Sequence, residues 1–389
     1  MKTGPWLLRQ AVTEDKKLFF QFGGQGGPWL REMSNLYRDY PELKTFFTRI
    51  FAWLDEGMAW LDLDPEEGIL TRGVQLKKWL EGEELPSREY LNQCGISLVG
   101  VHICQYAYYH LLTLNGNGPA SLLPRVAGMT GHSMGFHSAH LAAMGLEGDE
   151  FWRALRSFVL FVLVGGVRCQ QAWPMRTPDA DLVEKASALG GGVPTPMASV
   201  AGMSERDISL RLMLFNERLD PEEQVSISLR NSEDSIILSG PEEQLVDLGL
   251  RFLIEKGEEL KWSWLEVTAP FHSPLLWPAW DLFEKDQEFL DYDYTGAQVQ
   301  VPVYATWDGT NIQTLGDLYQ YSFLLMTSTP LDWPRTVEAI DEETGLIIDF
   351  GPGRLAPVLT RNALGEACCP EILSTSRRTN LRRMLGGAP

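Results

Sequence analysis

The sequence predicts an α/β protein whose main domain is interrupted by a small α+β insert. Val126–Thr130 has the pattern of a short strand, and a helical pattern follows it from Ser133. Between Met197 and Val267 the strand and helix patterns follow the order β-α-β-β-α-β, which is the ferredoxin-like unit. After this insert, strands again alternate with helical segments, so the chain returns to α/β character.

The main domain takes its elements from both sides of the insert. LFFQFGG, starting at Leu18, is typical of a buried strand that ends in a glycine-rich turn. A long helix is predicted from about Tyr90 to Leu114, where apolar residues have helical spacing. Further strands are predicted at Val301–Thr306 and Leu346–Gly351. We therefore expect one α/β domain built from two separate stretches of chain.

The insert is predicted element by element. Ser204 and Asp207 have the spacing of a capping box at the start of its first helix. Its elements are a strand at Met197–Gly202, two alternating strands around an Asn-Ser-Glu-Asp turn in Gln224–Gly240, a helix from Pro241 to about Lys256, and a strand at Leu260–Val267. The expected domains are a leader at 1–17, the core at 18–195 and 268–389, and the insert at 196–267.

The composition excludes several function classes. The 389 residues carry a formal net charge of −19, which repels nucleic acid and anionic membranes. The first residues lack the apolar core of a signal peptide, and the longest apolar run, Phe158–Val167, is about half a membrane span. The five cysteines follow no metal-binding or disulfide spacing. We expect a reducing, cytoplasmic setting with no metal, no nucleic-acid partner and no membrane partner.

The motif GHSMG, Gly131–Gly135, indicates a serine nucleophile. Gly-x-Ser-x-Gly at a strand-to-helix turn is the context of a nucleophile elbow, whereas the alternative is a merely tight glycine turn. Ser133 would lie at a helix N-terminus, where the backbone N–H of Met134 can face a developing oxyanion. A second turn, FGGQGG, lacks the Lys-Ser/Thr of a phosphate loop. Its Gln25 is better suited to donating an amide hydrogen bond.

A serine hydroxyl needs a base, and His272 is the best candidate among the six histidines. It lies in TAPFHSPLL, a loop whose two prolines would hold it rigidly. His132 is adjacent to Ser133 and cannot easily reach the hydroxyl as a base, although it can line the site. The other histidines are expected to be structural or to pack away from the site: His102, His110, His137 and His140.

Together these motifs resemble the acyl-CoA:acyl-carrier-protein transacylase family. FGGQGG is similar to that family's Gly-Gln-Gly turn, GHSMG to its nucleophile motif and TAPFHSPLL to its histidine loop. NSEDSIILSG resembles its asparagine hairpin, and DFGPGR resembles its C-terminal turn. GVRC, VTAPFHSPLL, VPVYATWDGT and IIDFGPG are similar to the acetyl-transferase domain of type I, fungal-type fatty acid synthases. The resemblance implies an α/β-hydrolase-like core with a ferredoxin-like subdomain, here as a stand-alone chain.

The resemblance also implies a role for each matching residue. Ser133 would form an acyl-serine, and His272 would be its base, oriented by a backbone carbonyl and not by an acid. Gln25 and the Met134 amide would frame the oxyanion hole. The candidate substrate-binding residues are His132, Gly165, Asn231 and Phe271.

The same resemblance implies ping-pong acyl transfer in fatty acid or polyketide biosynthesis. The substrates would be acyl-CoA or acyl carrier protein thioesters, and no cofactor is expected. The partner would be a holo acyl carrier protein, which carries a phosphopantetheine arm. Because carrier proteins are usually acidic, the net charge of −19 predicts a local basic patch at the mouth of the site, although the sequence does not show which arginines form it. The chain is expected to be a monomer.

The predicted acyl group is uncharged. Malonyl-specific members of the family carry an arginine on a helix after the nucleophile, and the matching position here is Gly165 in LVGGVRC. An unpaired malonate carboxylate buried in this apolar stretch would cost several kcal/mol. Arg168 lies nearby but is expected to be structural. Phe136 replaces the glutamate that malonyl members favour after the nucleophile motif.

The sequence leaves alternatives to this function. A hydrolase that removes acyl groups from carrier proteins would use the same dyad, and a malonyl-CoA:acyl-carrier-protein transacylase is a second alternative. An ordinary α/β-hydrolase esterase is disfavoured, because its histidine would lie near the C-terminus after an acid. A docking module without catalysis is disfavoured, because Ser133, His272 and Gln25 are all present.

Overall fold

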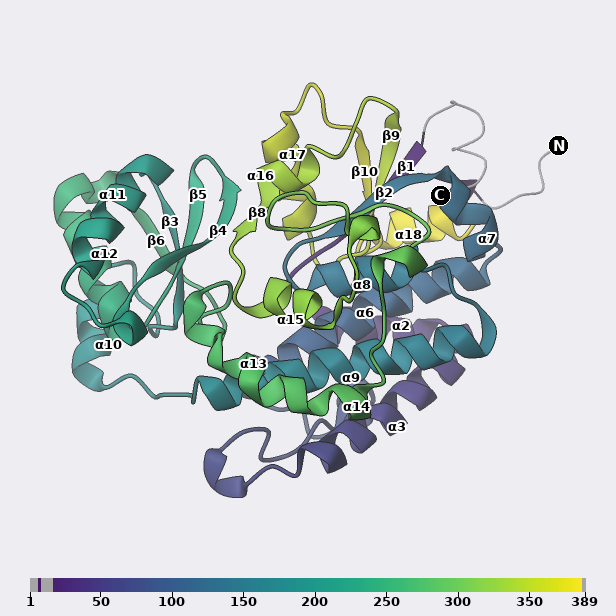
Figure 1. Ribbon diagram of the computed structural model, residues 1–389, viewed down its shortest axis with the longest axis horizontal. Coiled ribbons are helices and arrows are strands. Elements are labelled where there is room, and N and C mark those ends of the chain that lie inside the picture. Colours follow the sequence, from purple (N-terminus) through teal and green to yellow (C-terminus); the bar gives the residue numbers. More distant parts are fainter. Residues whose placement is uncertain (1–5, 8–16, 387–389) are drawn as a thin grey trace.

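The computed structural model describes residues 6–7 and 17–386, so nearly all of the expected leader at 1–17 lies outside the described residues. Figure 1 shows a larger α/β body and a smaller body beside it, which contains the second sheet. The two sheets have five strands each. This arrangement confirms the predicted α/β fold with an α+β insert.

The sheet of the larger body is parallel, in the strand order β10-β9-β1-β2-β7. Its strands are β1 Lys17–Phe22, β2 Val126–Gly131, β7 Val303–Tyr304, β9 Thr344–Asp349 and β10 Glu371–Ser374. Leu18 to Phe22 of the central strand are all buried, as expected for a strand covered on both faces. The strand expected at Val301–Thr306 shrinks to two residues at the sheet edge.

Long helices cover this sheet, and the innermost are buried along most of their length. They are α2 Trp29–Asp39, α3 Lys44–Leu61, α6 Cys94–Leu114, α8 Gly135–Ala143 and α9 Gly148–Ala172. The helix expected from Tyr90 is in fact two, because Asn92 and Gln93 separate α5 Arg88–Leu91 from α6. Gln93 has an extended backbone (φ −56°, ψ 138°), and its side-chain carbonyl accepts the N–H of Leu70.

The remaining helices complete the larger body. They are α4 Leu76–Leu80, α7 Pro119–Leu122, α13 Pro278–Phe283, α14 Gln287–Leu290, α15 Tyr319–Thr327, α16 Trp333–Val337, α17 Leu355–Leu364 and α18 Arg378–Met384. Of these, α16 and α17 contact β4 of the smaller sheet (Figure 1). They therefore form part of the junction between the two bodies.

The smaller sheet has the order β6-β3-β5-β4-β8. Its elements are β3 Met197–Ala201, α11 Glu205–Asn216, β4 Ser226–Ser232, β5 Ser235–Ser239, α12 Glu242–Lys256 and β6 Lys261–Trp264, in the predicted order. The Ser204 hydroxyl accepts the N–H of Asp207, which confirms the predicted helix cap. The fifth strand, β8 Leu331–Asp332, comes from the later stretch of chain and pairs in parallel with β4. The sequence did not indicate this strand.

The boundary expected at residue 196 leaves out a helix that packs on the smaller body. In α10, Ala180–Ser187, the side chains of Leu182 and Ala186 pack against Val246 of α12. Leu189 belongs to the apolar cluster of the smaller body. We propose that the smaller unit begins with α10.

A buried ion pair ties α9 to the segment before α14. Arg168 donates two hydrogen bonds to Asp286, at 2.8 and 2.9 Å, and the Asp286 side chain is 3% exposed. Trp60 also donates to Asp286, at 2.8 Å. Arg168 is therefore held as a structural residue, in agreement with the sequence-based expectation.

Removing the arginine of this pair should destabilise the protein. Arg168→Ala leaves the buried Asp286 carboxylate without its cation, which should lower the free energy of unfolding by about 3 kcal/mol. A matched control is Arg251→Ala, because Arg251 pairs with Asp247 at an exposed position, and should cost less than about 1 kcal/mol. Urea unfolding of the two variants measures the difference. Equal losses would contradict a structural role for the Arg168–Asp286 pair.

Candidate active site

The GHSMG turn forms the expected elbow between β2 and α8. Ser133 has a φ of +54°, a strained conformation for a residue with a side chain. A Cβ on Gly131 would clash with the backbone of Gly135, and a Cβ on Gly135 would clash with the carbonyl oxygen of Phe22. Both glycines are therefore required by close backbone packing. This packing presents the Ser133 hydroxyl at the end of the parallel sheet.

His272 lies beside this hydroxyl. The Ser133 Oγ and His272 Nε2 atoms are 2.7 Å apart, although the residues are 139 positions apart in the chain. The other ring nitrogen, Nδ1, donates to the Thr329 carbonyl at 2.8 Å. Since Nδ1 carries the hydrogen, Nε2 is free to accept the serine proton. No carboxylate hydrogen-bonds to His272 among the described residues, and the Thr329 carbonyl orients the ring.

Burial keeps this histidine neutral. Its side chain is almost completely buried, and desolvation lowers its pKa from 6.5 to about 4. The hydrogen bond to Thr329 opposes the shift, and nearby His132 adds to it. The His272 backbone also has a positive φ of +59°, and its N–H donates to the Thr327 carbonyl at 2.5 Å. The ring is thus positioned from two residues of one segment, Thr327 and Thr329.

Two backbone N–H groups lie close to the elbow without a carbonyl partner. Neither the N–H of Met134 nor that of Gln25 donates to another group within the described part of the chain. The side-chain amide of Gln25 is already used, because Nε2 donates to Ser97 Oγ at 2.7 Å. Gln105 fixes the backbone next to the Gln25 turn, because its Nε2 donates to the carbonyls of Gly23 and Gly351. Gln25 can therefore offer its backbone N–H more readily than its side chain.

A cavity of about 280 Å³ opens onto Ser133 at the junction of the two bodies. Its wall is mainly apolar, with Met197, Leu229, Ile237, Leu265, Val267, Phe271, Leu355 and Leu359. Polar residues in the lining include Gln25, His132, Asn231 and His272. Among the described residues of this lining, Glu266 is the one acidic side chain, and none is Lys or Arg. The cavity therefore combines a mainly apolar wall with the polar groups around Ser133.

Asn231 and His132 meet across the junction. His132 Nε2 donates to Asn231 Oδ1 at 2.9 Å, and the imidazole packs 5.2 Å from the Trp333 ring. Burial lowers the pKa of His132, and the bond to Asn231 opposes this shift. Asn231 lies inside β4, whereas the sequence placed it in the hairpin turn. The real turn is formed by Glu233 and Asp234, so β4 extends two residues further than that reading implied.

Gly165 is not brought to this cavity with the other predicted residues. It lies in α9, where an added Cβ would be 2.9 Å from the methyl group of Met326 and 3.4 Å from Phe323. Phe283 is also close, at 3.5 Å. Apolar side chains therefore cover the position that the resemblance matched to the arginine of malonyl-specific members.

The remaining histidines pack elsewhere, as expected. His102 bonds to Ser138 at 2.8 Å, and burial lowers the pKa of His102 and of His140 to about 3. The two ring nitrogens of His137 have no hydrogen-bond partner among the described residues. Burial also lowers the pKa of His137 well below its usual value.

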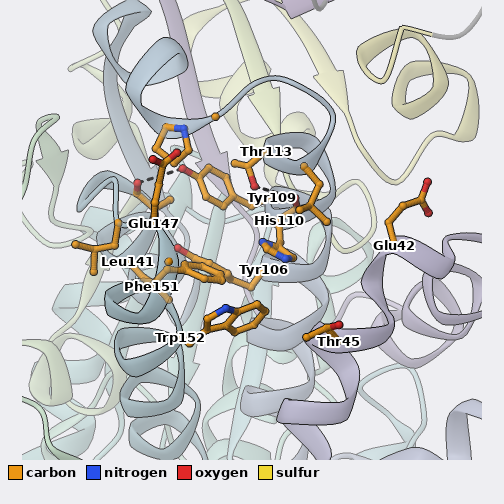
Figure 2. A pocket seen from close by; sticks show the side chains of 16 residues that line it. Glu42, Thr45, Tyr106, Tyr109, His110, Thr113, Leu141, Glu147, Phe151 and Trp152 are labelled. Atoms are coloured by element: carbon orange, nitrogen blue, oxygen red, sulfur yellow. Dashed lines mark hydrogen bonds between the residues drawn. The ribbon is translucent and has the colours of Figure 1, made fainter.

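His110 lines a second cavity, of about 430 Å³, between α6 and the start of α9 (Figure 2). Its ring stacks 5.1 Å from Phe151, and Trp152 packs edge-on at 5.4 Å. Burial lowers its pKa to about 4. Thr113 Oγ1 donates to the His110 backbone carbonyl, but no hydroxyl bonds to the His110 ring in the described part of the chain, so this cavity has no counterpart of the Ser133–His272 pair.

Within residues 6–7 and 17–386, no group of three or more His, Cys, Asp or Glu side chains is arranged to hold a metal ion. None of the helices in the same ranges is long and apolar enough to span a bilayer.

Known proteins resemble this chain in sequence and in fold. The fatty acid synthase subunit beta of Saccharomyces cerevisiae is 29% identical over 372 residues, which cover 90% of this chain and 18% of that relative. The chain spans about a fifth of the length of the curated relatives it matches.

Among solved structures, the malonyl-CoA:acyl carrier protein transacylase of Xanthomonas oryzae pv. oryzae has a TM-score of 0.65 at 21% identity, covering 95% of this chain and 98% of its own. A malonyl-transacylase in complex with its type II polyketide synthase acyl-carrier protein has a TM-score of 0.63 at 19% identity, covering 95% and 99%. These likenesses show that the fold is shared, with its hydrolase-like core and ferredoxin-like subdomain.

A family model covers most of the chain. The model described as the starter unit:ACP transacylase in aflatoxin biosynthesis matches residues 20–272, which is more than half of the sequence. The matched region begins in β1, contains the Ser133 elbow and the elements from α10 to β6, and ends at His272. The chain belongs to the starter unit:acyl-carrier-protein transacylase family.

Proposed function

We propose that this protein transfers an uncharged acyl group from a CoA or carrier thioester to a holo acyl carrier protein, through an acyl-serine at Ser133. The observation that carries the proposal is the 2.7 Å contact between Ser133 Oγ and His272 Nε2 beside a mainly apolar cavity. Family membership supports transfer to a carrier, and the fungal fatty acid synthase relatives support a role in fatty acid or polyketide biosynthesis.

The first half-reaction loads the serine. Ser133 Oγ attacks the thioester carbonyl while His272 Nε2 takes its proton. The oxyanion accepts hydrogen bonds from the backbone N–H groups of Met134 and Gln25. When the C–S bond breaks, the imidazolium returns the proton to the departing thiolate. The products are an acyl-serine ester, a free thiol and neutral His272.

The second half-reaction unloads it. The thiol of the carrier's phosphopantetheine arm enters the same cavity and gives its proton to His272 Nε2. The thiolate attacks the serine ester, the same N–H groups hold the oxyanion, and the C–O bond breaks as Ser133 regains a proton from His272. A new thioester leaves on the carrier.

The charges around the cavity support an uncharged acyl group. A malonate carboxylate needs a cation, and burying it unpaired costs several kcal/mol. Arg168 is held by Asp286, Gly165 is covered by apolar side chains, and none of the described residues that line the cavity is Lys or Arg. Solved relatives named malonyl transacylases share the fold, but at 21% identity or less they do not carry their substrate over to this chain.

Covalent loading tests the nucleophile and the acyl class together. Intact-protein mass spectrometry after incubation with acetyl-, hexanoyl-, decanoyl- or malonyl-CoA should show a neutral acyl adduct on the wild type and none on Ser133→Ala. Ser204→Ala, which removes an exposed helix cap, is the control and should load normally. An adduct on Ser133→Ala would disprove the nucleophile, and a predominantly malonyl adduct would disprove the uncharged class.

The low pKa of His272 predicts that the rate of acyl-serine formation depends little on pH on the acid side of neutrality. A pKa of about 4 leaves Nε2 unprotonated at higher pH, and the base is lost only as the pH falls through that value. The single-turnover rate of acyl-serine formation should therefore change less than about twofold between about pH 5 and 8. A rate that halves near pH 6.5, the ordinary value of histidine, would contradict the burial argument.

Gln25 provides a test of which amide holds the oxyanion. Removing an oxyanion-hole donor usually costs about 10²–10³ in rate. Because the Gln25 side chain is bonded to Ser97, Gln25→Ala should slow acyl-serine formation by less than about tenfold, in parallel with Ser97→Ala. A loss of about 10²–10³ in Gln25→Ala alone would show that the side chain acts as the donor.

A further inference from the structure

We propose that the exposed face of α17 is the docking surface for the acyl carrier protein. This inference rests on the proposed transfer to a carrier. The surface consists of Arg354, Leu355, Val358 and Arg361, and it adjoins the opening of the cavity that leads to Ser133.

The placement of α17 links the surface to the reaction. Leu355 and Leu359 line the cavity from one side of its opening, so the start of the helix forms part of the rim. The helix follows the Gly351–Gly353 turn, whose Gly351 carbonyl bonds to Gly23 N–H beneath the Gln25 turn. A carrier seated on α17 would thus sit next to the groups that receive its arm.

Two apolar side chains on this helix are largely exposed. Leu355 is 53% exposed and Val358 is 46% exposed. Residues three apart on a helix are neighbours on its surface, so Leu355, Val358 and Arg361 follow one stripe. An apolar stripe at the rim of a reaction cavity is suited to a partner helix of matching shape.

Arg354 and Arg361 lie at the two ends of this stripe. Neither Arg354 nor Arg361 forms an ion pair with any group in the described part of the chain. Other arginines, such as Arg153, Arg156 and Arg230, have carboxylate partners. The charge of Arg354 and Arg361 is available for an acidic partner, and rim charges of this kind mainly steer association.

Acidic residues lie on the smaller body. Glu233 and Asp234 form the β4–β5 turn, and Glu266 lies in the cavity wall, where it pairs with the exposed Arg88 at 2.5 Å. An acidic carrier would be repelled by Glu233 and Asp234 and attracted to the arginines of the α17 surface. The charge distribution therefore orients the carrier over the larger body. This orientation explains how a chain of net charge −19 can bind an acidic protein.

The test uses charge reversal in the full chain. The double variant Arg354→Glu/Arg361→Glu should raise the KM for a holo acyl carrier protein by about tenfold or more, while single-turnover loading from acyl-CoA stays within about twofold of the wild type. Val358→Ser should raise the same KM with loading unchanged. The probes are two holo carriers, the excised carrier domain of a fungal-type fatty acid synthase and a type II polyketide synthase carrier.

The matched control reverses two arginines on the smaller body. Arg206 and Arg218 lie in and just after α11, are exposed and have no ion-pair partner among the described residues. Arg206→Glu/Arg218→Glu changes the net charge by the same amount and should leave the KM for the carrier within about twofold. Direct titration of holo carrier onto the two double variants, each in a Ser133→Ala background, should show weak binding only for the α17 variant.

Three results would overturn the inference. The first is a KM for the carrier that is equal in the α17 variant and the control. The second is a loss of loading from acyl-CoA, but not from an acyl N-acetylcysteamine thioester, in the α17 double variant. This result would show that the arginines bind the CoA phosphates. The third, a wild type that loads acyl groups but transfers them to neither carrier, would remove the proposed function together with its docking surface.

Discussion

The hydrogen bond from His272 Nδ1 to the Thr329 carbonyl is the constraint on which the candidate site depends. It fixes the tautomer, so that Nε2 faces Ser133 Oγ as an acceptor. A neutral carbonyl does this without placing a second charge in the buried site. The pKa of His272 can then be lowered to about 4 by burial, and the base stays available over the physiological pH range. The proposed chemistry thus needs only two side chains and two backbone amides.

The fold meets this constraint by joining distant segments at one junction. The serine comes from the β2–α8 elbow, the histidine from the chain just after the smaller body, and Thr329 from the segment between α15 and β8. Since β8 adds to the smaller sheet, the strand that follows Thr329 is anchored to both bodies. The apolar cavity lies at the same junction. The same contacts therefore shape the cavity and position Ser133 and His272.

Local patterns in the sequence predicted what short-range geometry determines. The elbow around Ser133 and the Ser204 cap follow from spacing over a few residues, and both are present. Long-range features left no such signal. Thr329 acts through its backbone carbonyl, which no residue type marks, and β8 has only two residues. The spacing of the sequence matches Gly165 to an arginine position, whereas its surroundings depend on side chains from two other helices, α13 and α15.

The fate of the acyl-serine tests the central claim most directly, because transfer and hydrolysis share every residue of the site. The acyl-enzyme would be isolated after loading with hexanoyl-CoA, then mixed with buffer, apo carrier or holo carrier, and followed by intact-protein mass spectrometry. The account predicts an adduct that persists in buffer and with apo carrier, and that moves to the holo carrier thiol. An adduct lost to water at one rate in all three mixtures would contradict acyl transfer and identify a hydrolase.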